Sequence, residues 1–155
     1  MQRLGEVIAE INFPSSLWKG DKITGTITLK NPFNEDNVSL ICEVTTTWNG
    51  NYYACMAYVN AGQSHTFSFP TDFQMRIPEG APDPVMPDKD ATLEINATAL
   101  GYLKETSEKA TVTIKLSILR KTILGVPLWG WIALSSVIAV AGTSLYIVKK
   151  KKFKT

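Results

Sequence analysis

The feature that most constrains this chain is a run of 26 residues without one charged side chain, residues 123–148, near its C-terminus. A helix of about 20 apolar residues crosses the hydrocarbon core of a bilayer. Aromatic rings favour the headgroup region, and such rings lie near the two ends of this run: Trp129, Trp131 and Tyr146. The run therefore predicts a single transmembrane helix that begins near Val126, ends near Val148 and anchors the chain in a lipid bilayer.

The basic residues around this segment predict its orientation. Arg120 and Lys121 precede it, and five lysines follow it: Lys149, Lys150, Lys151, Lys152 and Lys154. The more basic flank normally stays on the cytoplasmic side of a membrane. We therefore expect residues 1–122 outside the cell, or on the equivalent face of an enveloped particle, and the lysine tail on the cytoplasmic or virion-interior side. The tail is suited to anionic lipid headgroups or to nucleic-acid phosphates.

The predicted organisation has three parts: a domain over residues 1–119, a juxtamembrane segment and helix over 120–148, and a basic tail over 149–155. Residues 1–122 hold 11 Lys and Arg against 14 Asp and Glu, a net charge of −3, so no broad basic surface for nucleic acid is expected on the domain. No signal-peptide pattern opens the sequence. Either such a signal has been removed, or the chain enters its membrane from the C-terminal end.

The domain is expected to be all-β, because apolar and polar residues alternate along several segments. In residues 22–30, for example, Ile23, Gly25, Ile27 and Leu29 share one face. Residues 90–99 and 110–119 repeat the pattern, and weaker candidates are residues 6–13, 38–48, 52–59 and 64–69. Seven short strands separated by turn signals predict a two-sheet sandwich of immunoglobulin-like type. The interval from Pro70 to Pro87 is rich in proline and is predicted to be an extended loop.

The two cysteines, Cys42 and Cys55, lie on the two arms of a predicted hairpin whose turn contains Asn49 and Gly50. With a two-residue turn they lie diagonally on one face of the hairpin. With a four-residue turn they lie directly opposite each other, which is the separation that a disulfide requires. The sequence leaves open whether they form a disulfide or serve as two small apolar residues.

Aromatic residues gather on the same hairpin: Trp48, Tyr52, Tyr53 and Tyr58. They are predicted either to present an exposed group that contacts a protein partner or to fill the core of the domain. Two glycosylation triplets also occur, at Asn37 and at Asn96. Asn96 is expected on the solvent face of its strand, where a glycan can be accommodated.

The sequence predicts no catalytic residue, no metal site and no cofactor. His65 is the single histidine and has no nearby cysteine or acid with which to form a catalytic pair. Four Cys or His ligands for structural zinc are absent. The acidic residues Asp83, Asp88 and Asp90 are expected to be solvated turn residues rather than calcium ligands.

The turn pattern resembles that of the CARDB-like immunoglobulin-type modules of archaeal and bacterial surface proteins and of some virus structural proteins. The matching residues, between positions 7 and 118, are Gly20 with Asp21, Asn31, Gly62 with Gln63, Met86 with Pro87, Asp88 and Asp90. The resemblance implies an adhesive, spacing or assembly domain without enzymatic activity. Residues 76–85 depart from the compact pattern of such modules.

A second resemblance is to the cytosolic tethers built from a major-sperm-protein domain and a tail anchor, to which residues 29–47 are similar. No coiled-coil linker separates the domain from the anchor here, and the lysine tail favours the opposite orientation. We therefore expect a non-enzymatic, membrane-anchored structural protein that belongs to a homo- or hetero-oligomeric assembly. The assembly is a virion, in which the chain is a minor capsid protein, or a cell surface. The alternatives are a tail-anchored cytosolic adaptor that binds partner peptides and a cell-surface adhesion module.

Overall fold

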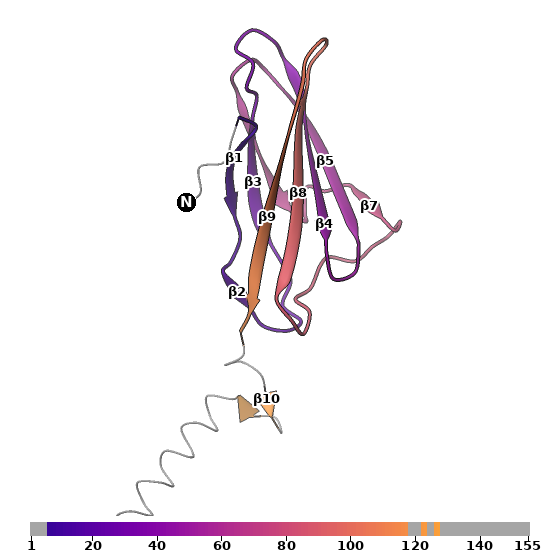
Figure 1. Cartoon of the computed structure of the whole chain (residues 1–155). Helices are drawn as coiled ribbons and strands as arrows, with labels where there is room; N and C mark the ends of the chain where they lie inside the picture. The colour runs from indigo at the N-terminus through magenta and orange to yellow at the C-terminus, as the bar shows by residue number, and fades with distance from the viewer. Residues whose placement is uncertain (1–5, 118–121, 124–125, 128–155) are drawn as a thin grey trace, which may run out of the picture. The chain divides into compact units, whose positions relative to one another are not determined.

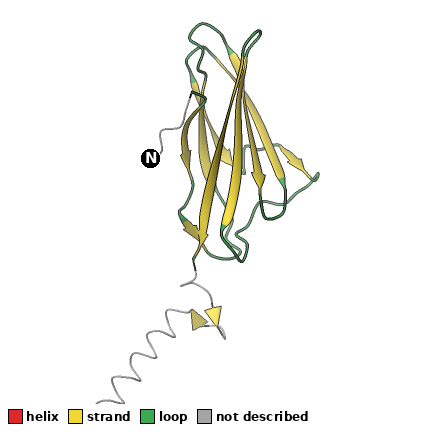
Figure 2. Cartoon of the chain, in the orientation of Figure 1, coloured by secondary structure: helices red, strands yellow, loops and turns green. Residues whose placement is uncertain are grey.

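The computed structural model describes residues 6–117, 122–123 and 126–127, and the chain divides into two compact units, residues 1–116 and 117–155. In these described ranges all regular secondary structure is β-strand (Figure 2). The described residues contain no helix with the length and hydrophobicity of a membrane span. Residues 128–155 hold most of the predicted helix and the whole lysine tail, and they lie outside the described residues.

The described residues of the first unit form nine strands in two sheets (Figure 1). A three-stranded sheet has the order β1-β3-β6, and a six-stranded sheet has the order β2-β9-β8-β4-β5-β7. The strands are β1 (Ile8–Asn12), β2 (Ser16–Leu17), β3 (Gly25–Lys30), β4 (Val38–Thr46), β5 (Tyr52–Val59), β6 (Ser64–Phe69), β7 (Met75–Ile77), β8 (Ala91–Leu100) and β9 (Glu105–Leu116). All neighbours are antiparallel except β2 and β9, which run parallel.

The inner faces of both sheets contribute to one hydrophobic core, as alternation requires of strands with one wet face. From β3, the side chains of Ile27 and Leu29 are fully buried, and from β8 those of Leu93 and Ile95 are buried. The predicted inward faces of residues 22–30 and 90–99 are thereby confirmed. For residues 110–119, Ile114 is buried whereas Val112 is half-buried, and Ile118 lies outside the described residues.

An aromatic cluster fills the core beneath the loop that follows β6. The ring of Phe69 packs edge-on against Tyr53 at 5.4 Å and against Phe73 at 5.1 Å, measured between ring centroids. The hydroxyl of Tyr53 donates a hydrogen bond of 2.9 Å to the carbonyl of Pro82. The proline-rich interval is therefore packed onto the core rather than standing away from it.

The structure adds two short strands to the seven expected ones. β2 pairs with the end of β9, and β7 occurs within the interval 70–87 that was predicted to be loop only. β7 has just three residues and lies at the edge of the six-stranded sheet, which is where proline-flanked strands are tolerated. Seven is therefore too low a strand count, because strands of two or three residues leave no periodic signal in a sequence.

Several residues of the turn pattern hold the ends of strands together. The Asn31 side chain is fully buried and donates to the carbonyls of Asp36 and Asn60, while its oxygen accepts from the amide of Phe33. At the opposite end of β3, the amide of Gly20 donates to the carbonyl of Met86 at 2.9 Å. These contacts connect segments far apart in the chain and so fix how the two sheets are joined.

In the second unit, the described residues form a small antiparallel pair, β10 (Thr122–Ile123) and β11 (Val126–Pro127). The sequence predicts that the transmembrane helix begins near Val126. In the structure Val126 pairs with Ile123 in this hairpin, and residues 128–148 of the predicted helix lie outside the described residues.

Candidate interaction surfaces

The outer face of β5 and β7 carries exposed apolar side chains at the edge of the six-stranded sheet. Met56 and Tyr58 of β5 are 67% and 70% exposed, and Met75 and Ile77 of β7 are 56% and 55% exposed. The register places Met75 opposite Ala54 and Ile77 opposite Tyr52, so the two strands present one continuous surface. We refer to these four exposed side chains as the β5–β7 face. Single exposed apolar residues are ordinary, whereas a contiguous group indicates contact with a partner.

The one charged residue of β7 does not contribute to this face. Arg76 is paired with the core residue Tyr53, and its guanidinium lies 5.8 Å from the centre of that ring. It forms an ion pair with Asp83 at 2.8 Å and donates to carbonyls of the loop that follows β6. Arg76 therefore stabilises the inner side of the proline-rich interval and leaves the outer side of β7 itself without charge.

Beside the β5–β7 face, a polar cluster joins three strands. The carboxylate of Glu43 on β4 accepts hydrogen bonds of 2.5 Å from the hydroxyl of Tyr52 and from the side-chain amide of Asn96 on β8. Burial, and then the hydrogen bond to Glu43, raise the pKa of Tyr52 to about 12. A shallow cavity of about 430 Å³ adjoins this cluster. The carboxylate of Glu43 is thus hydrogen-bonded by neighbours within the sheet.

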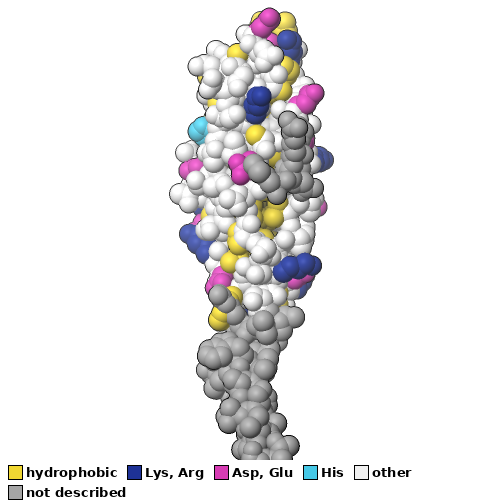
Figure 3. All heavy atoms as spheres, turned by 90° about the vertical axis from the view of Figure 1, so that its left-hand side faces the viewer, with side chains coloured by type: hydrophobic (Ala, Val, Ile, Leu, Met, Phe, Trp, Pro, Cys, Tyr) yellow, Lys and Arg dark blue, Asp and Glu magenta, His cyan; other side chains and the backbone are white. Residues whose placement is uncertain are grey.

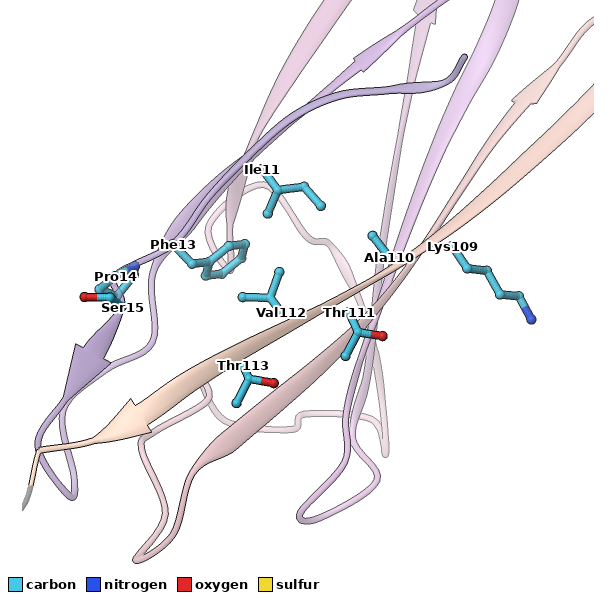
Figure 4. A pocket seen from close by; sticks show the side chains of 9 residues that line it. All are labelled: Ile11, Phe13, Pro14, Ser15, Lys109, Ala110, Thr111, Val112 and Thr113. Atoms are coloured by element: carbon cyan, nitrogen blue, oxygen red, sulfur yellow. The ribbon is translucent and has the colours of Figure 1, made fainter. Parts of the chain in front are cut away.

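A second candidate surface is a slot between the edge strands of the two sheets (Figure 4). It is a cavity of about 450 Å³ with an apolar centre. There Ile11 of β1 and Phe13, which directly follows β1, face Val112 of β9. Viewed from the side on which β1 lies, hydrophobic side chains reach the surface in the middle of the domain (Figure 3). The inward-facing residues Ala110 and Val112 are only half-buried here, because among the described residues no strand covers them.

The slot is closed at both ends by contacts between the same two edges. At one end the carboxylate of Glu108 accepts hydrogen bonds from the amides of Val7 and Ile8, at 3.1 and 2.9 Å. At the other end the amide of Lys115 donates to the carbonyl of Ser15, where β2 pairs with β9. The slot therefore has a defined length, and its floor is formed by Phe13, whose ring packs 5.9 Å from that of Phe69.

The hairpin that joins β8 and β9 ends in a third exposed apolar group. Tyr102 and Leu103 are 97% and 87% exposed. Lys104, which follows them, forms an ion pair of 3.1 Å with Asp36 and lies over the ring of Phe33. The turn is thus tied to the neighbouring loop while its two apolar side chains project into solvent.

The structure separates the aromatic residues that the sequence grouped together. Tyr53 is fully buried, and Trp48 is half-buried in the turn after β4 and packs against the core. Tyr52 is half-buried in the polar cluster, so Tyr58 is the one member of the four that is largely exposed. The four are thus divided between the core and the outer face, and Met56, Met75 and Ile77 are the exposed neighbours of Tyr58 that sequence reasoning missed. Strand pairing alone identifies Met75 and Ile77, because β7 lies in the predicted loop, whereas Met56 could have been found from its alternation with Tyr58 along the predicted strand 52–59.

The cysteines lie directly opposite each other, Cys42 on β4 and Cys55 on β5, because the turn has four residues. The amide of Thr46 donates to the carbonyl of Asn51, and Gly50 adopts a positive φ of 69° within this turn. Both cysteines are free thiols on the inner side of the sheet. Of the two predicted arrangements, the directly opposed one is the observed one.

The two glycosylation triplets differ in accessibility. Asn37 is exposed in the segment before β4, and its side-chain oxygen accepts from the amide of Ala61. Asn96 is on the outer face, as expected, but it is half-buried and its nitrogen donates to Glu43. Because the glycan attaches to that nitrogen, a glycan at Asn96 must fit beside the carboxylate of Glu43, whereas Asn37 is exposed.

The remaining predicted residues fall into two groups. His65 is exposed on β6, with its ring 4.6 Å from that of Phe67, and Asp83 and Asp90 are held by lysine or arginine side chains. In the part of the chain that the structure describes, no cluster of three or more metal-ligating residues occurs. The predicted anchor residues Trp129, Trp131, Tyr146 and Val148 and the tail lysines lie outside the described residues.

No protein-family model matches the sequence, and no curated protein matches it. The resemblances to CARDB-like modules and to major-sperm-protein tethers therefore stay predictions that rest on their turn residues.

Proposed function

We propose that this chain is a non-enzymatic structural protein, held to a membrane by residues 126–148, whose β domain contacts neighbouring proteins in a virion or cell-surface assembly. The observation that carries the proposal is the β5–β7 face, where Met56, Tyr58, Met75 and Ile77 are each more than half exposed. Exposing a contiguous apolar surface to water is unfavourable in free energy. Burial of that surface against a partner protein removes this cost. The partners expected are the proteins of a capsid or surface lattice.

The strand order supports an immunoglobulin-like sandwich as the fold of the domain. The first strand segment is divided between the sheets, with β1 beside β3 and β2 parallel to β9. The chain then crosses from β3 in one sheet to β4 in the other, and the long strands β4, β8 and β9 lie side by side. Folds of this type display contact surfaces on a rigid two-sheet frame and carry many unrelated functions.

The membrane attachment rests on the sequence, through its 26 uncharged residues and the five lysines that follow them. In the proposed orientation the domain is outside and the tail faces the cytoplasm or the particle interior. There the tail is suited to bind anionic lipid or nucleic acid, since each lysine near an anionic surface contributes about 1 kcal/mol.

Two measurements test this proposal. First, protease added to intact cells or particles is expected to remove the β domain and to leave a membrane-protected C-terminal fragment. Second, the chain is expected to co-sediment with particles or with a surface lattice in their native state. A chain that never co-sediments with either would contradict the structural role, whatever its topology.

The slot between β1 and β9 favours one second candidate, the tail-anchored cytosolic adaptor. A groove of about 450 Å³ that lies beside an open strand edge suits an extended peptide, which adds to the edge and places alternate side chains in the groove. In that case the domain is cytosolic, and protease outside intact cells leaves it whole. A cell-surface adhesion module, the remaining alternative, gives the same cleavage as the structural protein but binds opposing cells rather than a lattice.

A further inference from the structure

We propose that the β5–β7 face binds a second copy of this chain, through antiparallel pairing of the open edge of β5 about a two-fold axis. The inference deepens the proposed function, on which it rests, by naming the partner of the same surface. It predicts a symmetric dimer in which one six-stranded sheet continues into that of the partner.

The first observation is the open edge itself. β5 runs from Tyr52 to Val59, but β7 pairs only with Tyr52, Tyr53 and Ala54. Among the described residues, no strand pairs with residues 55–59 on the side away from β4. An edge of this kind presents unpaired N–H and C=O groups, to which another extended segment can add.

The second observation is that this edge lacks the usual protection against pairing. Natural edge strands commonly carry charged residues or proline that discourage association. β5 has the sequence YYACMAYV, which contains neither a charge nor a proline and is rich in aromatic and apolar residues. Its outward side chains in the open part, Met56 and Tyr58, are also its most exposed ones.

The third observation favours a second copy as the partner. The nearest charged groups of the six-stranded sheet are already engaged, Arg76 with Asp83 on the inner side and Glu43 with Tyr52 and Asn96. A two-fold axis brings each residue of a surface close to its own copy, so free charges there would repel each other. An uncharged apolar surface avoids that repulsion and is complementary to itself.

The geometry follows from the length of the open edge. Its middle residue is Ala57, and antiparallel pairing centred there places Met56 opposite Tyr58 of the partner subunit. Directly opposed side chains of antiparallel strands have Cβ atoms about 5 Å apart, which permits direct contact on the outer face. Stable interfaces bury about 800 Å² from each partner, and four side chains with one short strand pair supply less. We therefore expect a weak dimer, favoured further where the anchor confines the copies to one membrane.

The test uses the full-length chain in detergent micelles, with association measured by analytical ultracentrifugation over a range of protein concentrations. The wild-type chain is expected to dimerise. M56K and Y58E are each expected to weaken dimerisation at least about tenfold, because each buries an unpaired charge in an apolar contact. A mixture of M56K and Y58E is expected to form heterodimers, since Lys and Glu then face each other in the centred register.

A matched control is V85K, which also introduces lysine at an exposed apolar position but on the interval before β8, away from β5. It is expected to dimerise like the wild type. Far-ultraviolet circular dichroism of every variant shows whether the domain remains folded, and the mixing experiment itself excludes misfolding, because misfolded variants do not rescue each other.

Three results would overturn the proposal: a wild-type chain that stays monomeric at all concentrations, single variants that dimerise normally, or monomeric variants that do not associate when mixed. Its failure is distinguishable from failure of the proposed function. A monomeric chain that still co-sediments with a native lattice removes only the second copy as partner. A dimer that never co-sediments with particle or lattice removes the structural role instead.

Discussion

Cys42 and Cys55 are direct partners across the antiparallel pair β4 and β5, and the Cys55 Sγ lies 3.8 Å from the carbonyl oxygen of Cys42. Opposed residues in such a pair have Cα atoms about 4.5 to 5.5 Å apart, which is within the range that a disulfide spans. In the structure both are thiols. The contact with the Cys55 thiol, and then burial, raise the pKa of Cys42 far above its usual range.

The raised pKa predicts that the thiol of Cys42 is unreactive in the native chain. Alkylation requires the thiolate, and an ordinary cysteine forms it as the pH rises through about 8.5. We expect native Cys42 to be alkylated at least about tenfold more slowly than Cys42 of the urea-unfolded chain at every pH between about 7 and 9. Mass spectrometry of the modified peptide measures both rates, and a native rate that follows the unfolded one would contradict the buried, protonated state.

Tyr52 is predicted to titrate at higher pH than an ordinary tyrosine, near its pKa of about 12. Because burial and the bond to Glu43 favour the neutral phenol, this contribution to folding stability is complete below about pH 10 and is lost as the pH rises toward 12. Ultraviolet absorbance detects the phenolate, and Y52F identifies its step by removing it. E43Q is expected to lower the pKa of Tyr52 only in part, since burial remains. An unchanged pKa in E43Q would show that the carboxylate has no influence.

The buried amide of Asn31 is expected to matter for stability because all its bonding groups are used. N31A removes two donated hydrogen bonds and one accepted one, leaving backbone groups of Asp36, Asn60 and Phe33 without these partners. We expect a loss of about 2–4 kcal/mol in the free energy of unfolding, measured by urea denaturation. N34A, an exposed asparagine in the same loop, is the control and is expected to change it by less than about 0.5 kcal/mol.

Gly25 is predicted to tolerate no side chain. A Cβ at this position would lie 2.5 Å from the ring of Phe13 and 2.7 Å from the carbonyl oxygen of Asn12. G25A is therefore expected to destabilise the domain by about 1–3 kcal/mol, since backbone and ring must both move. Thermal unfolding measures the effect. The control is G101A, whose nearest neighbours would lie at 3.4 Å, and a loss as large in the control would contradict the steric explanation.

The alternation of residues was sufficient to locate most strands and their faces. Ile27 and Leu29, or Leu93 and Ile95, point inward because successive side chains of a strand point to opposite sides and only one side meets the core. The turn chemistry was readable where it is local, as in the positive φ of Gly50 and the bond from the Phe33 amide to Asn31. The bond from Asn31 to the carbonyl of Asn60 depends on the tertiary structure. β2 and β7 escaped prediction because each is too short to show a period.

The candidate surface was much less predictable. From the sequence, Tyr53 and Tyr58 are equivalent members of one aromatic hairpin, yet one is in the core and the other on the outer face. Tyr53 and Tyr58 point to opposite faces of β5 because one has an odd and the other an even position along the strand. Which of the two faces is outward depends on the sheet that packs against the strand. Met75 and Ile77 join Tyr58 only because β7 folds back onto β5, a pairing between segments about 20 residues apart in the chain.

By itself, the sequence determined that the domain is all-β, which side chains along each strand can share a face, and that the C-terminal segment suits a bilayer, because each of these properties depends on neighbouring residues. The tertiary structure alone decided the strand order, the opposition of Cys42 and Cys55, the inward turn of Arg76 and the exposed β5–β7 face. The alternation of apolar and polar residues defines the two faces of a strand, but it does not define which strand pairs with it. The choice of partner and register depends on how distant segments pack together and bury a common core.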